Sequence, residues 1–243
     1  LEQYAEDGVL VLGGAAAILL QVADPVVAAG VARHSAFATD PLRRLRHTLT
    51  YVYAVTLGDE ELTRIAAHAV DRRHEGVTGA RDPDRQLWVA ATLYRVGVDL
   101  HQRLHGPLPE AVADEVYAAS ARLGTALQLP PGMWPADRAA FDAYWDDALA
   151  GLRVGDDARA VARDVLHPRA APLWARAAMP PVRIVTAALL DDRIRRAYGI
   201  PSAPRRARLL LAITRVLSRI APRRLRSLPS RRLLAGLRAA RSR

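Results

Sequence analysis

The 243-residue sequence contains no cysteine and no lysine, and only 5% of its residues are aromatic. Without cysteine there can be no disulfide, iron–sulfur cluster or thiolate-bound metal, so a metal centre would need histidine, carboxylate or tyrosine ligands. Long apolar runs are also missing, and no basic segment precedes the apolar stretch near the start. The sequence therefore predicts neither a membrane-spanning helix nor a signal peptide, and we expect a cytoplasmic protein.

Strand signals are scarce as well. Alternating runs of Val, Ile and Thr between Asn-Gly turns are missing, whereas alanine and leucine dominate a chain that is 51% hydrophobic. This pattern predicts an all-α fold with a buried core, built as a single multi-helix domain of about ten helices. Proline and glycine punctuation places these helices at residues 9–23, 25–37, 41–57, 59–75, 85–104, 109–127, 135–150, 156–166, 181–197, 203–220 and 230–241.

The sequence also lacks the signatures GxGxxG, GxxxxGK[ST], HExxH and GxSxG. Gly13 and Gly14 precede an apolar helix, but no strand comes before them and no acidic ribose partner follows at the proper distance. A dinucleotide site is therefore not expected there. We expect these glycines to allow close helix packing instead.

Charge is distributed unevenly along the chain. All 25 acidic residues lie before residue 193 beside 19 of the 35 basic ones, which gives this part a net charge of −6, whereas 16 arginines and no acid follow. We therefore expect a helical domain at 1–202 and Arg-rich C-terminal helices at 203–243. The simplest interpretation is that these helices pack on the domain with solvated arginines. Peripheral contact with an anionic membrane is an alternative, whereas nucleic-acid binding is not expected beside an acidic body without a nucleic-acid motif.

Histidine is the remaining source of catalytic or metal-binding chemistry, with seven in the chain: His34, His47, His68, His74, His101, His105 and His167. His101 and His105 have the i, i+4 spacing of metal ligands, but without an HExxH motif we expect two surface histidines. The adjacent carboxylates at 146–147, 156–157 and 191–192 point to different helix faces, so capping and solvation explain them.

Three further residues lie at positions that leave a functional role open. Arg44 and Thr48 lie i, i+4 on one helix face, where they could together contact a polar or anionic ligand. Alternatively, Arg44 reaches solvent while Thr48 bonds back to its own helix. His74 lies at the edge of the buried stripe of the helix at 59–75, a place where a histidine is usually structural.

Four stretches together resemble one protein family. They are AAAILLQVADPVVAAGVARHSAFATDPLRRLRHTLTYVYAVTLG at 15–58, HEGVTG at 74–79, DPDRQLWVAATLYRVGV at 82–98 and AAMPPVRIVTAALLDDRIRRAYGIP at 177–201. Each motif is weak singly, but their order and spacing are similar to those of the rubber oxygenase catalytic domain family. This family groups latex-clearing proteins with fungal MpaB-type oxygenases. The resemblance spans nearly the whole chain.

The resemblance implies an all-α fold with a haem-sized interior pocket. For latex-clearing proteins it further implies a b-type haem bound by a proximal histidine and dioxygen-dependent cleavage of a carbon–carbon double bond. His74 matches the histidine that would ligate the haem iron. Arg44 and Thr48 match residues that look toward the haem from the other side, where Arg44 could also pair with a propionate. Neutral imidazole is a good ligand for haem iron.

The sequence departs from the family pattern at two places. Asp24-Pro25 stands where the family has His-Pro, and the segment between Gly79 and Asp82 is short and lacks a tyrosine. His34 and Ser35 also fall in a shared motif, where a helix-linking hydrogen bond is their expected role.

Three hypotheses about function follow. The first is a haem-dependent oxygenase that uses dioxygen on a small lipophilic substrate, either isoprenoid-like or a biosynthetic intermediate. The second is a helical protein that binds an apolar ligand without oxygen chemistry. The third is a peripheral membrane protein that docks through residues 203–243.

Overall fold

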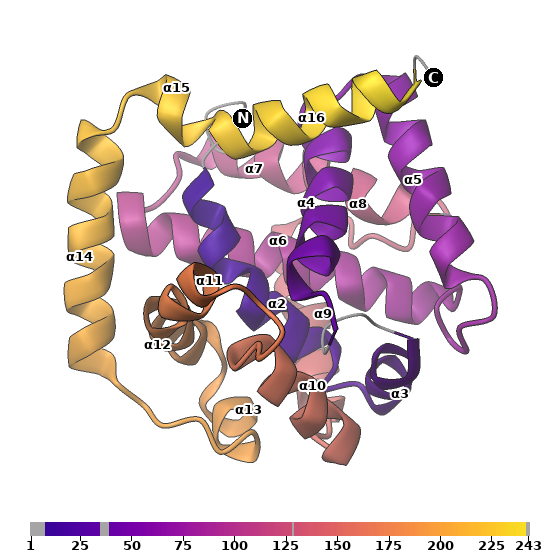
Figure 1. The fold of residues 1–243 in the computed structure, drawn as a ribbon. Coiled ribbons are helices and arrows are strands. Elements are labelled where there is room, and N and C mark those ends of the chain that lie inside the picture. The colour runs from indigo at the N-terminus through magenta and orange to yellow at the C-terminus, as the bar shows by residue number, and fades with distance from the viewer. Residues whose placement is uncertain (1–7, 35–38, 128, 242–243) are drawn as a thin grey trace.

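Every regular element that the computed structural model describes, at residues 8–34, 39–127 and 129–241, is helical (Figure 1). The expected all-α class is confirmed. In chain order the elements are η1 Gly8–Gly13, α2 Gly14–Gln21, α3 Pro25–His34, α4 Pro41–Leu57, α5 Glu60–His74, α6 Pro83–His105, α7 Glu110–Ser120, α8 Arg122–Thr125, α9 Arg138–Gly151, α10 Asp156–Leu166, α11 Leu173–Ala177, α12 Met179–Leu189, α13 Asp192–Ala197, α14 Pro204–Ile220, α15 Arg223–Arg226 and α16 Leu228–Arg241.

Several of these helices have an aspartate as their N-cap residue. Asp40 accepts a hydrogen bond from the backbone N–H of Arg43 at the start of α4, and Asp59 accepts one from Leu62 at the start of α5. The capping carboxylate satisfies an N–H group that has no partner within the helix. Asp82, Asp137 and Asp191 act in the same way for α6, α9 and α13. The capping role expected for the 191–192 pair is therefore confirmed at Asp191.

Three of the expected long helices are divided. Residues 9–23 form the 3-10 helix η1 followed by α2, 109–127 form α7 and α8, and 181–197 form α12 and α13. The last division follows the end of α12 at Leu189, and Asp191 then caps α13. The short helices α11 and α15 were not expected. They are only a turn or so long, so they carry too little periodicity to be recognised in a sequence.

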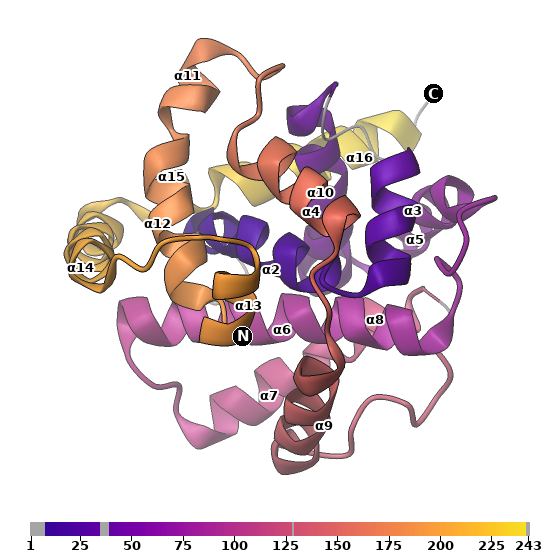
Figure 2. The same cartoon turned by 90° about the horizontal axis from the view of Figure 1, so that it is seen from below.

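The long helix α6 lies at the centre of the molecule. Figure 2 shows it crossing the fold with α2 on one side and α7 and α9 on the other. Trp88 and Tyr94 of α6 contact Trp145 and Phe141 of α9, with ring centroids 5.1 and 4.8 Å apart. A Cβ atom at Gly13 would lie 2.8 Å from Val96, so this glycine does allow close packing on α6, as the sequence predicted.

A second buried cluster joins the α4–α5 pair to α6, α8 and α16. Tyr51, Val55 and Leu62 are buried there together with Leu234 of α16. The C-terminal helices thus pack on the rest of the chain, since α14 contacts α6 and α12 while α16 lies across α4 and α5 (Figure 1).

Among the described residues, no single helix is both long and apolar enough to cross a membrane. The segments Gly8–Gln21 and Pro25–Arg33 reach the required length only together, and the chain bends by 112° between them. Most of α2 is buried in the core.

Candidate functional site

The α4–α5 hairpin brings Arg44 close to His74. The two helices are joined only by Gly58 and Asp59, so they run antiparallel. Arg44 and His74 lie about equally far along the chain from this connection. Because each residue advances an α-helix by about 1.5 Å, the first turns of α4 lie beside the last turn of α5. Arg44 and His74, about thirty positions apart in the sequence, therefore lie at the same end of the hairpin.

Arg44 and Thr48 form a closed pair on α4. The guanidinium Nη1 of Arg44 donates to the Thr48 hydroxyl at 2.9 Å, and that hydroxyl donates to the backbone carbonyl of Arg44 at 3.3 Å. The back-bonding of Thr48 considered from the sequence is therefore present. However, Arg44 does not extend into solvent: burial, and secondarily the positive charge of Arg73, lower the pKa of its guanidinium.

His74 is a half-buried histidine at the last position of α5. Burial lowers the pKa of its imidazole, and the charge of Arg44 lowers it further, while Asp71 opposes this effect. The neutral form therefore predominates near pH 7. Neither ring nitrogen is hydrogen-bonded to another residue of the described ranges. The His74 ring is therefore a neutral imidazole whose nitrogens have no hydrogen-bond partner among the described residues.

The loop that follows His74 is fixed against α3 and α5. Gly79 has a φ of +78°, and a Cβ atom there would lie 2.6 Å from Cγ1 of Val26. On the other side, Arg81 donates to both carboxylate oxygens of Asp71, at 3.0 and 3.1 Å. The short loop therefore has defined contacts at both of its sides.

Asp24, which replaces the family's histidine, has a structural role. Its carboxylate accepts hydrogen bonds from the backbone N–H groups of Val26 and Val27, at 2.8 and 2.9 Å, at the start of α3. It also lies 3.6 Å from Nε of Arg85 on α6. This aspartate thus caps one helix and links it to another.

The structure adds further cationic residues to those chosen from the sequence. Burial, followed by the charge of Arg73 and then those of arginines on α4, lowers the pKa of His47. Arg73 in turn has a pKa lowered by burial, then by Arg72 and Arg43. The doublets Arg43-Arg44 and Arg72-Arg73, each beside a motif residue, were the sequence signal for this cluster. Such a concentration of positive charge is suited to an anionic group.

The other histidines form no metal centre in the parts of the chain that the structure describes. No group of three or more His, Asp or Glu side chains in those parts could hold a metal ion. His101 and His105 are half-buried, and their ring centroids lie 4.9 Å apart. The His34 side chain and Ser35 fall outside the described residues.

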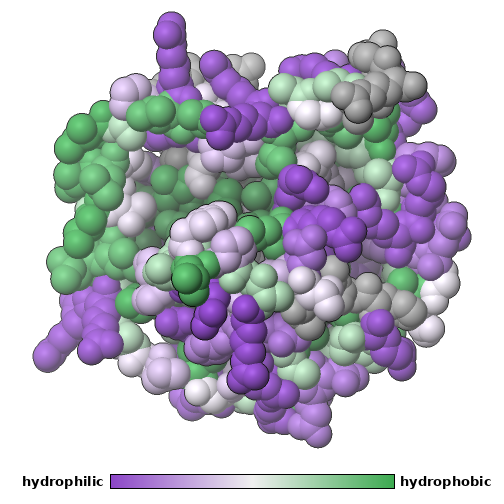
Figure 3. Space-filling view, in the orientation of Figure 1, coloured by the Kyte–Doolittle hydropathy of each residue, from purple (hydrophilic) through white to green (hydrophobic). Residues whose placement is uncertain are grey.

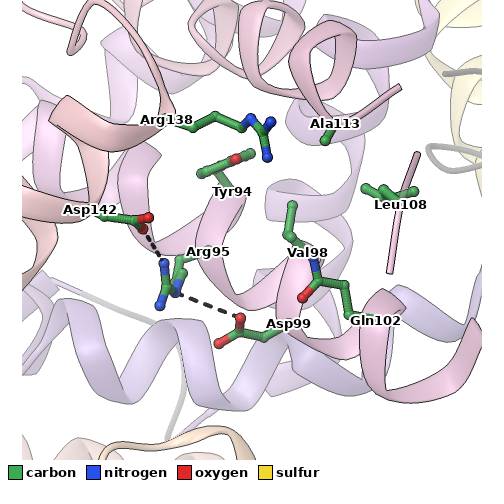
Figure 4. A pocket seen from close by; sticks show the side chains of 9 residues that line it. All are labelled: Tyr94, Arg95, Val98, Asp99, Gln102, Leu108, Ala113, Arg138 and Asp142. Carbon is green, nitrogen blue, oxygen red and sulfur yellow. Dashed lines mark hydrogen bonds and ion pairs between the residues drawn. The ribbon is translucent and has the colours of Figure 1, made fainter. Parts of the chain in front are cut away.

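A separate cavity of about 220 Å³ lies between α6, α7 and α9 (Figure 4). Arg95 donates to Asp142 at 2.6 Å and lies 3.6 Å from Asp99, while Arg138 donates to Asp114 at 2.7 Å. The two arginines are thus already neutralised. A cavity so small and so polar does not fit a flat apolar macrocycle. The haem pocket that the resemblance implies remains a prediction for the His74 end of the hairpin.

The half-buried Arg44–Thr48 pair and His74 lie within a part of the chain that matches one known protein family. The family model described as "ER-bound oxygenase mpaB/B'/Rubber oxygenase, catalytic domain" matches residues 2–219. The chain belongs to this family, so the domain is that of an oxygenase family, as the four motifs predicted.

The curated relatives carry no assigned activity. Uncharacterized proteins Rv2237 of Mycobacterium tuberculosis and Mb2261 of Mycobacterium bovis are each 37% identical to this chain over 227 residues, covering 86% of it and 89% of the relative. No solved structure matches the chain.

Proposed function

We propose that the protein is a haem-dependent oxygenase in which His74 would ligate the haem iron and the substrate is a small lipophilic molecule. The observation that carries this proposal is the half-buried His74 beside Arg44, with an imidazole pKa lowered by burial and then by the Arg44 charge, inside the range that the oxygenase family model matches. Dioxygen is the proposed oxidant.

The residues present suit a haem. Neutral imidazole is the form that binds iron, and a haem needs only one protein ligand, so a cluster of several metal-binding side chains is unnecessary. The arginines around the site complement the negative charges of haem propionates. A bound haem would supply dioxygen activation, which no side chain of the protein can provide.

We assign supporting roles to Arg44 and Thr48. Arg44 keeps its charge at any physiological pH, and its hydrogen bond to Thr48 fixes its guanidinium on α4. It can donate either to a propionate or to an oxygen atom of the reactants. Thr48 orients Arg44, and its hydroxyl is a second donor if it turns away from the helix carbonyl.

Absorbance spectroscopy of the purified full chain, loaded with haem, tests this assignment. We expect a Soret band that shifts on reduction with dithionite and again on addition of carbon monoxide. His74→Ala should lose most of this band, and added imidazole should restore it. His68→Ala is the matched control because His68 is exposed on the same helix.

Two results would contradict the proposal. One is the absence of stoichiometric haem binding by the folded wild-type protein. The other is a full Soret band in His74→Ala that is lost in a variant of a different histidine. Binding of an apolar ligand by a protein that takes up no haem would instead support the alternative of a non-catalytic binding protein.

A further inference from the structure

The large exposed hydrophobic side chains are concentrated in one region. Within the described ranges there are eight of them, and all lie on α11, α14 and α15. Figure 3 shows the corresponding hydrophobic surface over α14 and α15, with another apolar projection at α11. Single exposed hydrophobic residues are ordinary, but a gathered set marks an interaction surface. The eight residues are Leu173, Trp174, Leu209, Ile213, Val216, Leu217, Ile220 and Leu225.

Helix α14 is apolar on two faces. Its inner face places Ala207 and Leu211 in the buried core against α6 and α12. Leu209, Ile213 and Leu217 follow one another at i, i+4 spacing on the outer face, so they form a continuous stripe along the helix. Nothing in the described part of the fold covers this stripe, and Ile220 at its end is 73% exposed.

Arginines lie at both ends of the stripe. Arg206 precedes Leu209 by three residues and Ile213 by seven, so it lies on the line of the stripe at the N-terminal end of α14. Arg205 flanks it, while Arg219 and Arg224 lie at the other end, and all four are exposed. No acidic residue follows Asp192 anywhere in the sequence.

This charge pattern distinguishes between two kinds of partner. A second copy of the chain would place the same patch on both sides of a symmetric contact. The arginines of one copy would then meet those of the other, with no carboxylate in this segment to neutralise them. An anionic lipid surface is complementary, because the apolar stripe enters the acyl boundary while the arginines bind lipid phosphates.

We propose that α14, α15 and the tip of α11 form a face that docks on an anionic membrane. From the sequence, membrane contact through residues 203–243 was one alternative, and the exposed Leu173 and Trp174 extend the proposed face to α11. Helices α11 and α14 both contact α12, and Figure 2 shows α11 beyond one end of α12 and α14 beside it. This inference does not depend on haem binding, although the two proposals are compatible, since a lipophilic substrate partitions into membranes.

Co-sedimentation of the full chain with lipid vesicles tests the docking face. We expect binding to vesicles that mix phosphatidylcholine with phosphatidylglycerol, weak binding to phosphatidylcholine alone, and release by salt. Arg205→Gln with Arg206→Gln should weaken binding roughly thirty-fold, since each surface cation contributes about 1 kcal/mol. Leu209→Ser with Ile213→Ser should weaken it by at least about tenfold. Arg122→Gln with Arg163→Gln, which removes equal charge from exposed positions on α8 and α10, should leave it unchanged.

The outcomes are distinct from those of the haem assay. Equal vesicle binding by the wild type and both α14 variants, with native circular dichroism, would overturn the proposal. So would a soluble dimer that does not bind vesicles and dissociates in Leu209→Ser with Ile213→Ser, because the stripe would then be a self-association surface.

Trp174 provides an internal reporter for α11. It is 68% exposed, whereas Trp88 and Trp145 are buried and Trp134 is half-buried. Its emission should therefore shift to shorter wavelength when anionic vesicles are added, and Trp174→Phe should remove the shift. An unchanged spectrum for vesicle-bound protein would overturn the inclusion of α11 in the face.

Discussion

Arg44 and Thr48, one helical turn apart on α4, are joined by two hydrogen bonds. The Arg44 guanidinium donates to the Thr48 hydroxyl at 2.9 Å, and this hydroxyl donates to the backbone carbonyl of Arg44 at 3.3 Å. The pair needs no residue outside α4 to form. It fixes a permanently charged group beside the imidazole of His74, where burial and then this charge lower the pKa of the imidazole.

Removing the hydroxyl tests the strength of this pair. Thr48→Val keeps the shape of the side chain but leaves the guanidinium without this acceptor, so it should lower the free energy of unfolding by about 1–2 kcal/mol. Urea denaturation measures the change. Thr48→Ser retains a hydroxyl and should recover most of the loss. Wild-type stability in Thr48→Val would show that the hydrogen bond contributes nothing.

Removing the charge of Arg44 should raise the pKa of His74. The positive guanidinium disfavours the imidazolium, so Arg44→Gln lets His74 titrate at higher pH than in the wild type. NMR titration of the His74 ring in protein purified without haem measures this shift. Arg64→Gln, which removes an exposed charge from the first half of α5, is the control and should leave the titration in place. A downward shift in Arg44→Gln would contradict the geometry described for the hairpin.

The glycines after His74 give a matched pair of substitutions. Gly76 and Gly79 have φ angles of +73° and +78°, but a Cβ atom at Gly76 meets nothing within 4 Å, whereas one at Gly79 meets Val26 at 2.6 Å. Gly76→Ala should lower stability by roughly 1 kcal/mol because of its backbone conformation alone. Gly79→Ala should lower it more, since the loop must also move away from α3. Thermal unfolding of both variants measures the difference, and equal losses would contradict the close approach.

The raised pKa of the Asp99 carboxyl should make the stability of the fold depend on pH. Burial raises the pKa of its carboxyl despite the opposing charges of Arg95 and Arg103. Between the ordinary pKa of 3.8 and the raised pKa, the folded state therefore binds more protons than the unfolded state, so stability falls as pH rises through this range. At higher pH the charged carboxylate destabilises the fold. Asp99→Asn should thus gain stability relative to the wild type as pH increases from about 4 toward 7. Parallel denaturation curves across this range measure the gain.

The companion carboxylate serves as the control. Asp142 accepts a hydrogen bond from the same Arg95 at 2.6 Å but is exposed. Asp142→Asn weakens that contact without removing a half-buried charge, so this variant should be no more stable than the wild type at pH 7. An Asp99→Asn variant less stable than the wild type at pH 7 would show that the ion pair with Arg95 outweighs the burial of the carboxyl.

The sequence predicted the helices where strong local signals mark their ends. The helix at 41–57 was predicted at its observed bounds because Pro41 and Gly58 delimit it. The division of 181–197 was missed, since Asp191 could be recognised as a capping residue but nothing in the sequence showed that the preceding helix ends at Leu189. Helix α11 was missed for a different reason: it is a single turn between prolines, and its exposed Leu173 and Trp174 break the pattern of a buried face.

For the candidate site, spacing and motif similarity identified His74, Arg44 and Thr48, but not their surroundings. Periodicity placed Arg44 and Thr48 on one face of α4, yet it could not show that this face lies beside the end of α5. That proximity depends on hairpin packing. The cationic environment from Arg43 and Arg73 depends on the same packing, so it became visible only in three dimensions.

Helix α16 begins after the last residue that the family model matches, and it packs on both helices of the hairpin, with Leu234 in their shared cluster. This segment beyond the matched domain thus supports the hairpin from outside. Shortening the chain at the family boundary would remove Leu234 from the cluster that contains Tyr51 and Leu62, and would remove the contacts of α16 with the two helices that carry Arg44 and His74. An expression fragment should therefore extend through Arg241 if the geometry around His74 is to be preserved.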